Sequence, residues 1–217
     1  MSSYQNFLND FKTAATAANR DIEEINLIAV SKKKSSEDIK KIIDLKHVSY
    51  GENQIQEVEK KWIDLKSKYA GLKLHFIGGV QSRKVKSIYH HCDVIHSLDR
   101  EKIVKSFSEC EAAFGASKEY FIQINTGDEL QKSGVMLSEA EQFISSCIEN
   151  YKLNIIGLMC IPPFNEDPQK HFLNLADIAK NFDLPSLSMG MSNDFEVALK
   201  CGATHIRIGT KIFGERN

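Results

Sequence analysis

Proline and net charge are both scarce in this sequence. Only 4 of the 217 residues are proline, and three of these fall within Pro162–Pro168, which we interpret as one loop. No Gly/Ser-rich linker divides the chain, so we predict one domain over residues 1–217. The 28 basic and 29 acidic residues give a formal net charge of −1. This balance supplies neither the basic surface typical of nucleic-acid-binding proteins nor a polybasic membrane-binding patch.

Paired cysteines and long hydrophobic runs are also missing. The five cysteines are scattered without a CxxC motif, which is typical of reduced cysteines in a cytoplasmic protein. The longest apolar stretch, near Ile155–Ile161, is far shorter than the ~18 residues of a membrane-spanning helix. The polar segment Met1–Asp10 lacks the pattern of a signal peptide. We expect no metal site, because the adjacent side chains of His90-His91-Cys92 point in different directions and no second ligand pair follows.

The chain alternates between short apolar runs and helical segments. Eight runs have the composition of buried strands: Asn26–Ser31, His47–Gly51, Lys73–Gly78, Asp93–Leu98, Tyr120–Asn125, Asn154–Ile161, Pro185–Met189 and Thr204–Gly209. In Asn53–Tyr69 apolar residues recur every three or four positions, as on one face of a helix. An extra amphipathic helix within residues 1–20 precedes the first strand. Capping patterns predict helix starts at Ser35, Ser138 and Asn193.

Strands that alternate with helices predict an α/β fold with a parallel sheet. Eight such units favour closure into a (β/α)8 barrel of the TIM type, with short loops because 217 residues is small for that fold. A doubly wound open sheet is the alternative, and periodicity does not separate the two.

Residues that follow the last two strands are suited to phosphate binding. In a barrel, function lies at the carboxyl ends of the strands, and phosphate often binds after strands seven and eight. Gly190 and Gly209 allow close backbone approach, Thr210 offers a hydroxyl, and Ser192 precedes the helix start expected at Asn193. The alternative is that these glycines form ordinary strand-to-helix turns.

Lys32 stands at the end of an apolar first strand. Partial burial there would lower the pKa of its amine toward the neutral form that makes Schiff bases. Strand alternation places Lys33 on the opposite face. Three consecutive lysines are more often exposed, so the residues alone favour a solvated cluster at Lys32–Lys34.

Taken together, the motifs resemble one family. Eight segments occur in order over most of the chain: LIAVSKKK (27–34), GEN (51–53), HFIG (75–78), QS (81–82), KSG (132–134), GLM (157–159), LSMGMSN (187–193) and RIGTKIFGE (207–215). They resemble the pyridoxal-phosphate homeostasis proteins, with departures at Gly79 and Arg83. The resemblance implies a barrel similar to the N-terminal domain of alanine racemase, with pyridoxal 5′-phosphate held by Lys32 as an aldimine.

The resemblance also implies roles for other residues. Ser192, Gly209 and Thr210 would hold the phosphate, and Asn53 would lie near the ring or its 3′ oxygen. Arg207 would face the pyridine nitrogen, as an arginine does in the racemase barrel.

The expected function is that of a non-catalytic cofactor carrier in vitamin B6 homeostasis, which supplies pyridoxal phosphate to apo-enzymes. No tyrosine or histidine stands by motif at a strand end as a second acid or base, since His75 and His96 fall within strands and are expected to line the barrel. One alternative is a pyridoxal-phosphate-dependent amino-acid racemase or similar enzyme. Another is a Schiff-base aldolase acting on a sugar phosphate.

Overall fold

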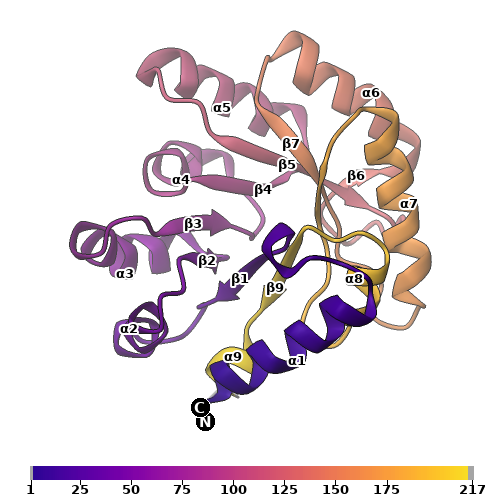
Figure 1. The fold of residues 1–217 in the computed structure, drawn as a ribbon. Coiled ribbons are helices and arrows are strands. Elements are labelled where there is room, and N and C mark those ends of the chain that lie inside the picture. The colour runs from indigo at the N-terminus through magenta and orange to yellow at the C-terminus, as the bar shows by residue number, and fades with distance from the viewer. Residues whose placement is uncertain (1, 215–217) are drawn as a thin grey trace.

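The computed structural model describes residues 2–214. Met1 and residues 215–217 of the predicted domain, including Glu215 of the last motif, lie outside them. Figure 1 shows strands at the centre with helices around them. The strands are β1 (Asn26–Val30), β2 (Ser49–Glu52), β3 (Lys73–Phe76), β4 (Val94–Leu98), β5 (Glu119–Asn125), β6 (Val135–Met136), β7 (Ile155–Met159), β8 (Ser186–Ser188) and β9 (His205–Ile208).

Eight of these strands close a parallel barrel. Each pairs in parallel with its neighbour in the order β1-β2-β3-β4-β5-β7-β8-β9, and β9 pairs back with β1. The predicted (β/α)8 barrel is therefore confirmed. The open doubly wound sheet is wrong, because the pairing of β4 with β5 leaves the eight strands no free edge.

Helices cover the outside of the barrel. The α-helices are α1 (Ser3–Ala17), α2 (Ser36–Asp44), α3 (Ile55–Lys68), α4 (Val85–His91), α5 (Glu101–Phe114), α6 (Ala140–Ser145), α7 (Pro168–Asn181), α8 (Phe195–Lys200) and α9 (Thr210–Phe213). Short 3-10 turns are Ile22–Glu24, Ser82–Lys84 and Leu137–Glu139, and a π turn, Ser146–Asn150, continues α6. No helix of residues 2–214 is both long enough and apolar enough to cross a membrane.

Helix α3 follows the predicted pattern. Its residues Ile55, Val58, Trp62 and Leu65 are all buried, so the apolar face packs on the barrel. The same face also buries Lys61, which the pattern did not predict.

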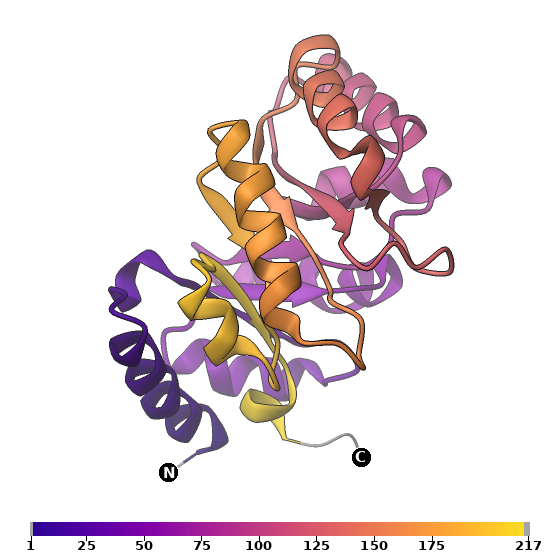
Figure 2. The ribbon, with the colours of Figure 1, turned by 90° about the vertical axis from the view of Figure 1, so that its right-hand side faces the viewer.

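The predicted N-terminal helix is confirmed as α1. Tyr4, Phe7, Phe11 and Ala15 are its buried residues, and the ring of Phe7 meets that of Phe195 edge-on at 5.4 Å between centroids. Figure 2 shows α1 beside the C-terminal helices α8 and α9. The helix therefore covers the part of the barrel formed by the last strand-helix units.

Only one of the three expected helix caps is formed. The Ser35 hydroxyl accepts the Asp38 amide at 3.1 Å and begins α2. The cap expected at Ser138 is wrong, because this residue lies inside the 3-10 turn that precedes α6. The cap expected at Asn193 is also wrong. The Asp194 carboxylate accepts the Met191 amide at 2.6 Å, and the helix begins one residue later than predicted, after Asp194.

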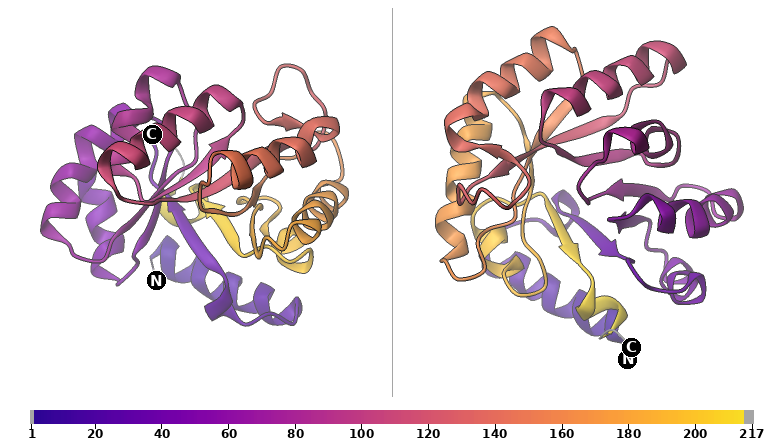
Figure 3. Two further views of the ribbon diagram at one scale, coloured as in Figure 1. Left: turned by 90° about the horizontal axis from the view of Figure 1, so that it is seen from above. Right: turned by 180° about the vertical axis from the view of Figure 1, so that it is seen from behind.

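The two-residue strand β6 was not predicted. It pairs with the end of β5 at the base of a segment that joins β5 to α6. Figures 2 and 3 show this segment standing out from the barrel, and Leu130 within it is 91% exposed.

Candidate functional site

A cavity of about 900 Å³ opens at the carboxyl ends of the barrel strands. This is the end of a (β/α)8 barrel where binding sites lie. The structure brings all the predicted site residues to its wall: Lys32, Asn53, Ser192, Arg207, Gly209 and Thr210. Because they come from the ends of four different strands, only barrel closure brings them together.

Lys32 lies in a turn rather than on a strand. Strand β1 ends at Val30, and Lys33 takes a left-handed backbone conformation with a φ of 60°. Strand alternation therefore does not separate the two lysines, and that argument was wrong. The left-handed turn separates them instead: Lys32 lines the cavity, whereas Lys33 is not among its lining residues.

Two hydroxyls converge on the side of the cavity formed by the last two strands. Thr210 Oγ1 donates a hydrogen bond to Ser192 Oγ at 3.2 Å. Ser192 is half-buried in the segment after β8, while Thr210 begins α9 directly after Gly209. A Cβ at Gly209 would meet only Val30, at 3.4 Å from its carbonyl oxygen, which is an ordinary contact. Protein packing alone therefore does not require a glycine at this position.

Asn53 is held against the segment that follows β3. A Cβ built on Gly78 would lie 2.1 Å from the Asn53 carbonyl oxygen, so the two backbones touch only because residue 78 has no side chain. On its other side, the Gly78 carbonyl accepts the Ser97 hydroxyl at 2.5 Å. The place of Asn53 in the cavity wall thus depends on a glycine.

Arg207 reaches the cavity from within β9. The residue is 4% exposed. Its Nη1 donates to Ser188 Oγ at 2.8 Å and its Nη2 to the Cys160 carbonyl at 2.9 Å. Two fixed hydrogen bonds therefore hold a permanent positive charge in the cavity wall.

Behind Arg207, a chain of hydrogen bonds crosses the barrel interior. Ser188 Oγ lies 2.8 Å from Nδ1 of His96, and His96 Nε2 lies 2.9 Å from Nδ1 of His75. His75 Nε2 lies 2.9 Å from Ser49 Oγ. Both histidines are fully buried, as predicted, and burial holds the pKa of each well below its usual value. Both rings are therefore neutral.

The chain resembles known proteins in sequence and in fold. The family model described as "Alanine racemase, N-terminal domain" matches residues 5–217. The pyridoxal phosphate homeostasis protein of Escherichia coli (strain K12) is 36% identical, with 94% of this chain and 91% of that protein covered. That of Aquifex aeolicus is 35% identical, with coverages of 96% and 95%.

Solved structures agree with these matches. PipY of Synechococcus elongatus PCC7942, in a structure with PLP bound, has a TM-score of 0.81 at 28% identity. The match covers 92% of this chain and 97% of PipY. An alanine racemase of Clostridium difficile has a TM-score of 0.76 at 13% identity and is covered over 55% of its length, so it shares the fold alone. The chain thus belongs to the pyridoxal phosphate homeostasis protein family, built on the alanine racemase N-terminal fold.

Proposed function

We propose that this protein binds pyridoxal 5′-phosphate through Lys32 and supplies it to apo-enzymes in intracellular vitamin B6 homeostasis. The observation that carries the proposal is the meeting of six residues from four separate motifs in one cavity. The printed names of the relatives support it, as does the PipY structure with PLP bound.

The donor set of the cavity fits this cofactor. A neutral lysine amine would condense with the aldehyde carbon, and the aldehyde oxygen would leave as water with the two amine protons. In the wall of the same cavity, the hydroxyls of Ser192 and Thr210 can donate to a phosphate dianion, and Gly209 leaves the backbone accessible. We assign Asn53 to the ring or its 3′ oxygen on the same grounds. One amine and two hydroxyls in the wall of one cavity match a ligand that carries both an aldehyde and a phosphate.

Arg207 supports a carrier rather than a catalyst. Bound pyridoxal phosphate acts as an electron sink for amino-acid chemistry, and this is strongest when its ring nitrogen is protonated. The guanidinium of Arg207, fixed by Ser188 and the Cys160 carbonyl, can only donate. Facing the ring nitrogen, it would keep that nitrogen unprotonated.

The residues that line the cavity also support a carrier rather than a racemase. Among residues 2–214, the side chains that line it include no tyrosine and no histidine. Racemisation needs an acid and a base on opposite faces of the bound substrate. The lining does include the ionisable side chains of Lys132, Glu166 and Asp194, so the carrier proposal rests mainly on Arg207, and we propose no catalytic residue. The alternative, a racemase or similar enzyme, is suggested by the fold shared with alanine racemase.

The proposal includes a cytoplasmic setting. All five cysteines lie in the described part of the chain and are free. Burial raises the pKa of Cys92, Cys147 and Cys160 to about 12, so these thiols are unreactive core residues.

The test is covalent trapping. The purified protein is mixed with pyridoxal phosphate, its visible spectrum is recorded, and borohydride fixes the adduct for peptide mapping. We expect the modified peptide to carry Lys32, and Lys32→Ala to abolish the adduct. Mapping of the adduct to Lys33, Lys34 or Lys211 would overturn the assignment, and absence of any adduct would overturn the proposed function.

A second assay separates the carrier from an enzyme. The loaded protein is incubated with L- and D-amino acids, and separately with an apo-enzyme that needs pyridoxal phosphate. We expect recovery of the apo-enzyme's activity without turnover of amino acids. Turnover at about 1 per second or faster, an ordinary enzymatic rate, would favour the racemase alternative.

A further inference from the structure

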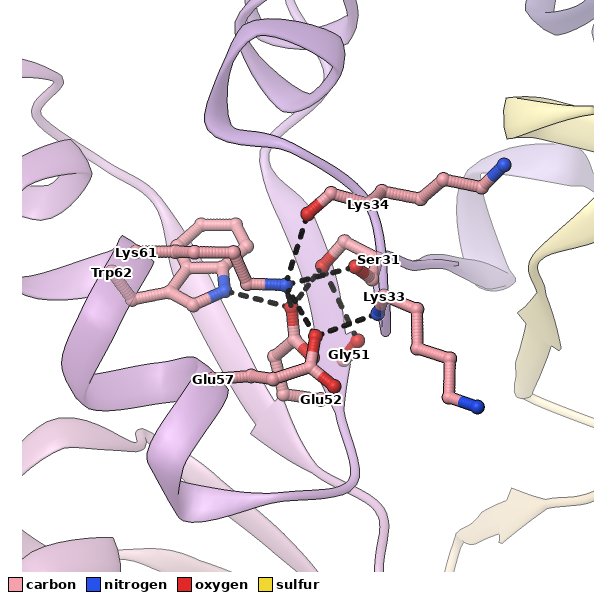
Figure 4. A network of polar contacts seen from close by, with 8 residues as sticks. All are labelled: Ser31, Lys33, Lys34, Gly51, Glu52, Glu57, Lys61 and Trp62. Atoms are coloured by element: carbon pink, nitrogen blue, oxygen red, sulfur yellow. Dashed lines mark hydrogen bonds and ion pairs between the residues drawn. The ribbon is translucent and has the colours of Figure 1, made fainter. Parts of the chain in front are cut away.

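A buried lysine holds the loop that carries Lys32. Lys61 of α3 is 6% exposed. Its Nζ donates to the Ser31 carbonyl at 3.0 Å and to the Lys34 carbonyl at 3.4 Å. These two carbonyls flank Lys32 and Lys33 on either side. One ammonium group therefore forms hydrogen bonds with both ends of the turn (Figure 4).

A carboxylate holds the middle of the same turn. Glu57 Oε2 accepts the Lys33 amide at 2.6 Å and also the Lys61 ammonium at 2.8 Å. Glu57 Oε2 thus connects the middle of the turn to Lys61, which is hydrogen-bonded to both of its ends. Figure 4 shows the side chains of Lys33 and Lys34 pointing away from this network.

A second carboxylate anchors the network in the barrel. Glu52 Oε1 lies 2.6 Å from Lys61 Nζ and accepts the Ser31 hydroxyl at 2.7 Å and the Trp62 indole N–H at 3.1 Å. Glu52 is fully buried, so its charge requires the Lys61 ammonium. All three contacts use Oε1, whereas the buried Oε2 of Glu52 has no hydrogen-bond partner among the described residues.

The conformation that this network holds is an unfavourable one. Lys33 has a φ of 60°, in the left-handed region that residues with a Cβ avoid. Such a conformation costs energy, which surrounding contacts can offset, although five other residues with a side chain also have a positive φ: Asn19, Lys46, Asp128, Lys152 and Asp183. Here the contacts reach the Ser31 carbonyl, the Lys33 amide and the Lys34 carbonyl, on both sides of Lys32.

We propose that Glu57 and Lys61 are positioning residues, which hold the left-handed turn at Lys33 and thereby direct the Lys32 amine into the cavity. The inference rests on the proposed function, because it assigns these residues to the same covalent step. Neither Glu57 nor Lys61 lines the cavity, so both act through Lys32 and not by contact with the ligand.

The experiment compares two ligands and three variants. Pyridoxal phosphate forms the covalent bond, whereas pyridoxine 5′-phosphate has an alcohol in place of the aldehyde and reports only non-covalent binding. Glu57→Ala removes the oxygen that holds the Lys33 amide but leaves Lys61 paired with Glu52. Glu57→Gln keeps one oxygen able to accept both donors. Glu59→Ala is the matched control, because Glu59 is an exposed residue of the same helix that bonds to Ser87 Oγ.

We expect Glu57→Ala to slow formation of the Lys32 adduct about 10- to 100-fold, the effect of a small misplacement of a reacting group. Its affinity for pyridoxine phosphate should equal that of the wild type. Glu57→Gln should restore the rate to near the wild-type value, and Glu59→Ala should not change it. Circular dichroism and urea unfolding check that each variant is folded.

Two results would overturn the inference while leaving the proposed function intact. One is a Glu57→Ala variant that forms the adduct as fast as Glu59→Ala does. The other is an equal loss of both ligands, which would mean that the network shapes the whole cavity and not the position of Lys32. If the wild type forms no adduct at all, the proposed function itself fails.

Discussion

Arg207 donates a 2.8 Å hydrogen bond from Nη1 to the Ser188 hydroxyl. Because a guanidinium has no acceptor, Ser188 Oγ accepts this bond, and the same oxygen lies 2.8 Å from Nδ1 of His96. His96 Nε2 lies 2.9 Å from Nδ1 of His75, and His75 Nε2 lies 2.9 Å from Ser49 Oγ. The Ser188 hydroxyl thus connects the charge at the cavity wall to two buried histidines.

Replacement of Ser188 by alanine should therefore lower the free energy of unfolding. In Ser188→Ala, Arg207 loses an acceptor and His96 loses a hydrogen-bond partner, both in the barrel interior. Each buried group left without its partner costs about 1–3 kcal/mol, so we expect the free energy of unfolding to fall by about 2–6 kcal/mol in urea. Ser106→Ala is the control, since this half-buried residue of α5 donates its hydroxyl to the Lys102 carbonyl of its own helix. A loss no greater than that of the control would mean that the chain does not stabilise the barrel.

Stability should depend on pH through the buried histidines. Burial lowers the pKa of His47 and His205 to about 4 and holds that of His75 and His96 well below its usual value. In the unfolded chain a histidine has a pKa of about 6.5. As the pH falls below this value, protons bind the unfolded chain first, and the free energy of unfolding decreases. Each such histidine contributes about 1.4 kcal/mol per pH unit between about 6.5 and its folded pKa.

The measurement is urea unfolding between pH 7.5 and pH 5. Below pH 6.5, His205→Gln should reduce the slope of the unfolding free energy against pH by about 1.4 kcal/mol per pH unit, which corresponds to one proton. The substitution removes one histidine whose pKa is lowered by burial and keeps a polar side chain beside Thr204. A slope that does not change would contradict the prediction for this residue.

The phosphate assignment predicts a selective loss of affinity. Ser192→Ala together with Thr210→Ala removes two hydroxyls that lie 3.2 Å apart in the cavity wall. Hydrogen bonds to a charged group are worth about 1.5–3 kcal/mol each, so we expect the affinity for pyridoxal phosphate to fall by at least about tenfold. The affinity for pyridoxal, which has no phosphate, should hardly change. An equal loss for both ligands in the two titrations would place the phosphate elsewhere.

The barrel could be predicted because its signals are local. Apolar runs such as Leu27–Val30 alternate with helical periods such as that of α3, and each signal lies within one element. The cavity followed from the same information, since barrel closure brings all strand ends to one face. Lys32 and Thr210 could therefore be expected near one another from their positions relative to strands.

The parts that were missed depend on contacts between distant segments. Lys61 sits on an amphipathic helix, where a lysine usually faces solvent. Its burial comes from acceptors on β2 and on the turn after β1, which no periodicity reveals. Asn193 failed as a cap because the neighbouring Asp194 carboxylate accepts the Met191 amide. Strand β6, with two residues, is too short to give a pattern.

The two glycines after β3, Gly78 and Gly79, differ in the space that each leaves for a side chain. Gly78 and Gly79 both line the cavity, and each loses similar backbone freedom in the unfolded chain when changed to alanine. A Cβ at Gly78 would lie 2.1 Å from the Asn53 carbonyl oxygen, whereas the nearest atom to a Cβ at Gly79 is Ser133 Oγ at 3.8 Å.

We therefore expect Gly78→Ala and Gly79→Ala to behave differently. The backbone at Asn53 must move to admit the first methyl group, at a cost of about 1–3 kcal/mol in the free energy of unfolding. Because Asn53 lines the cavity, this shift should also weaken pyridoxal phosphate binding. Gly79→Ala should stay within about 0.5 kcal/mol of the wild type and bind normally. Urea unfolding and a pyridoxal phosphate titration on both variants decide the matter. If Gly78→Ala retains both properties, Asn53 can move freely and the assignment of its side chain to the ring loses its support.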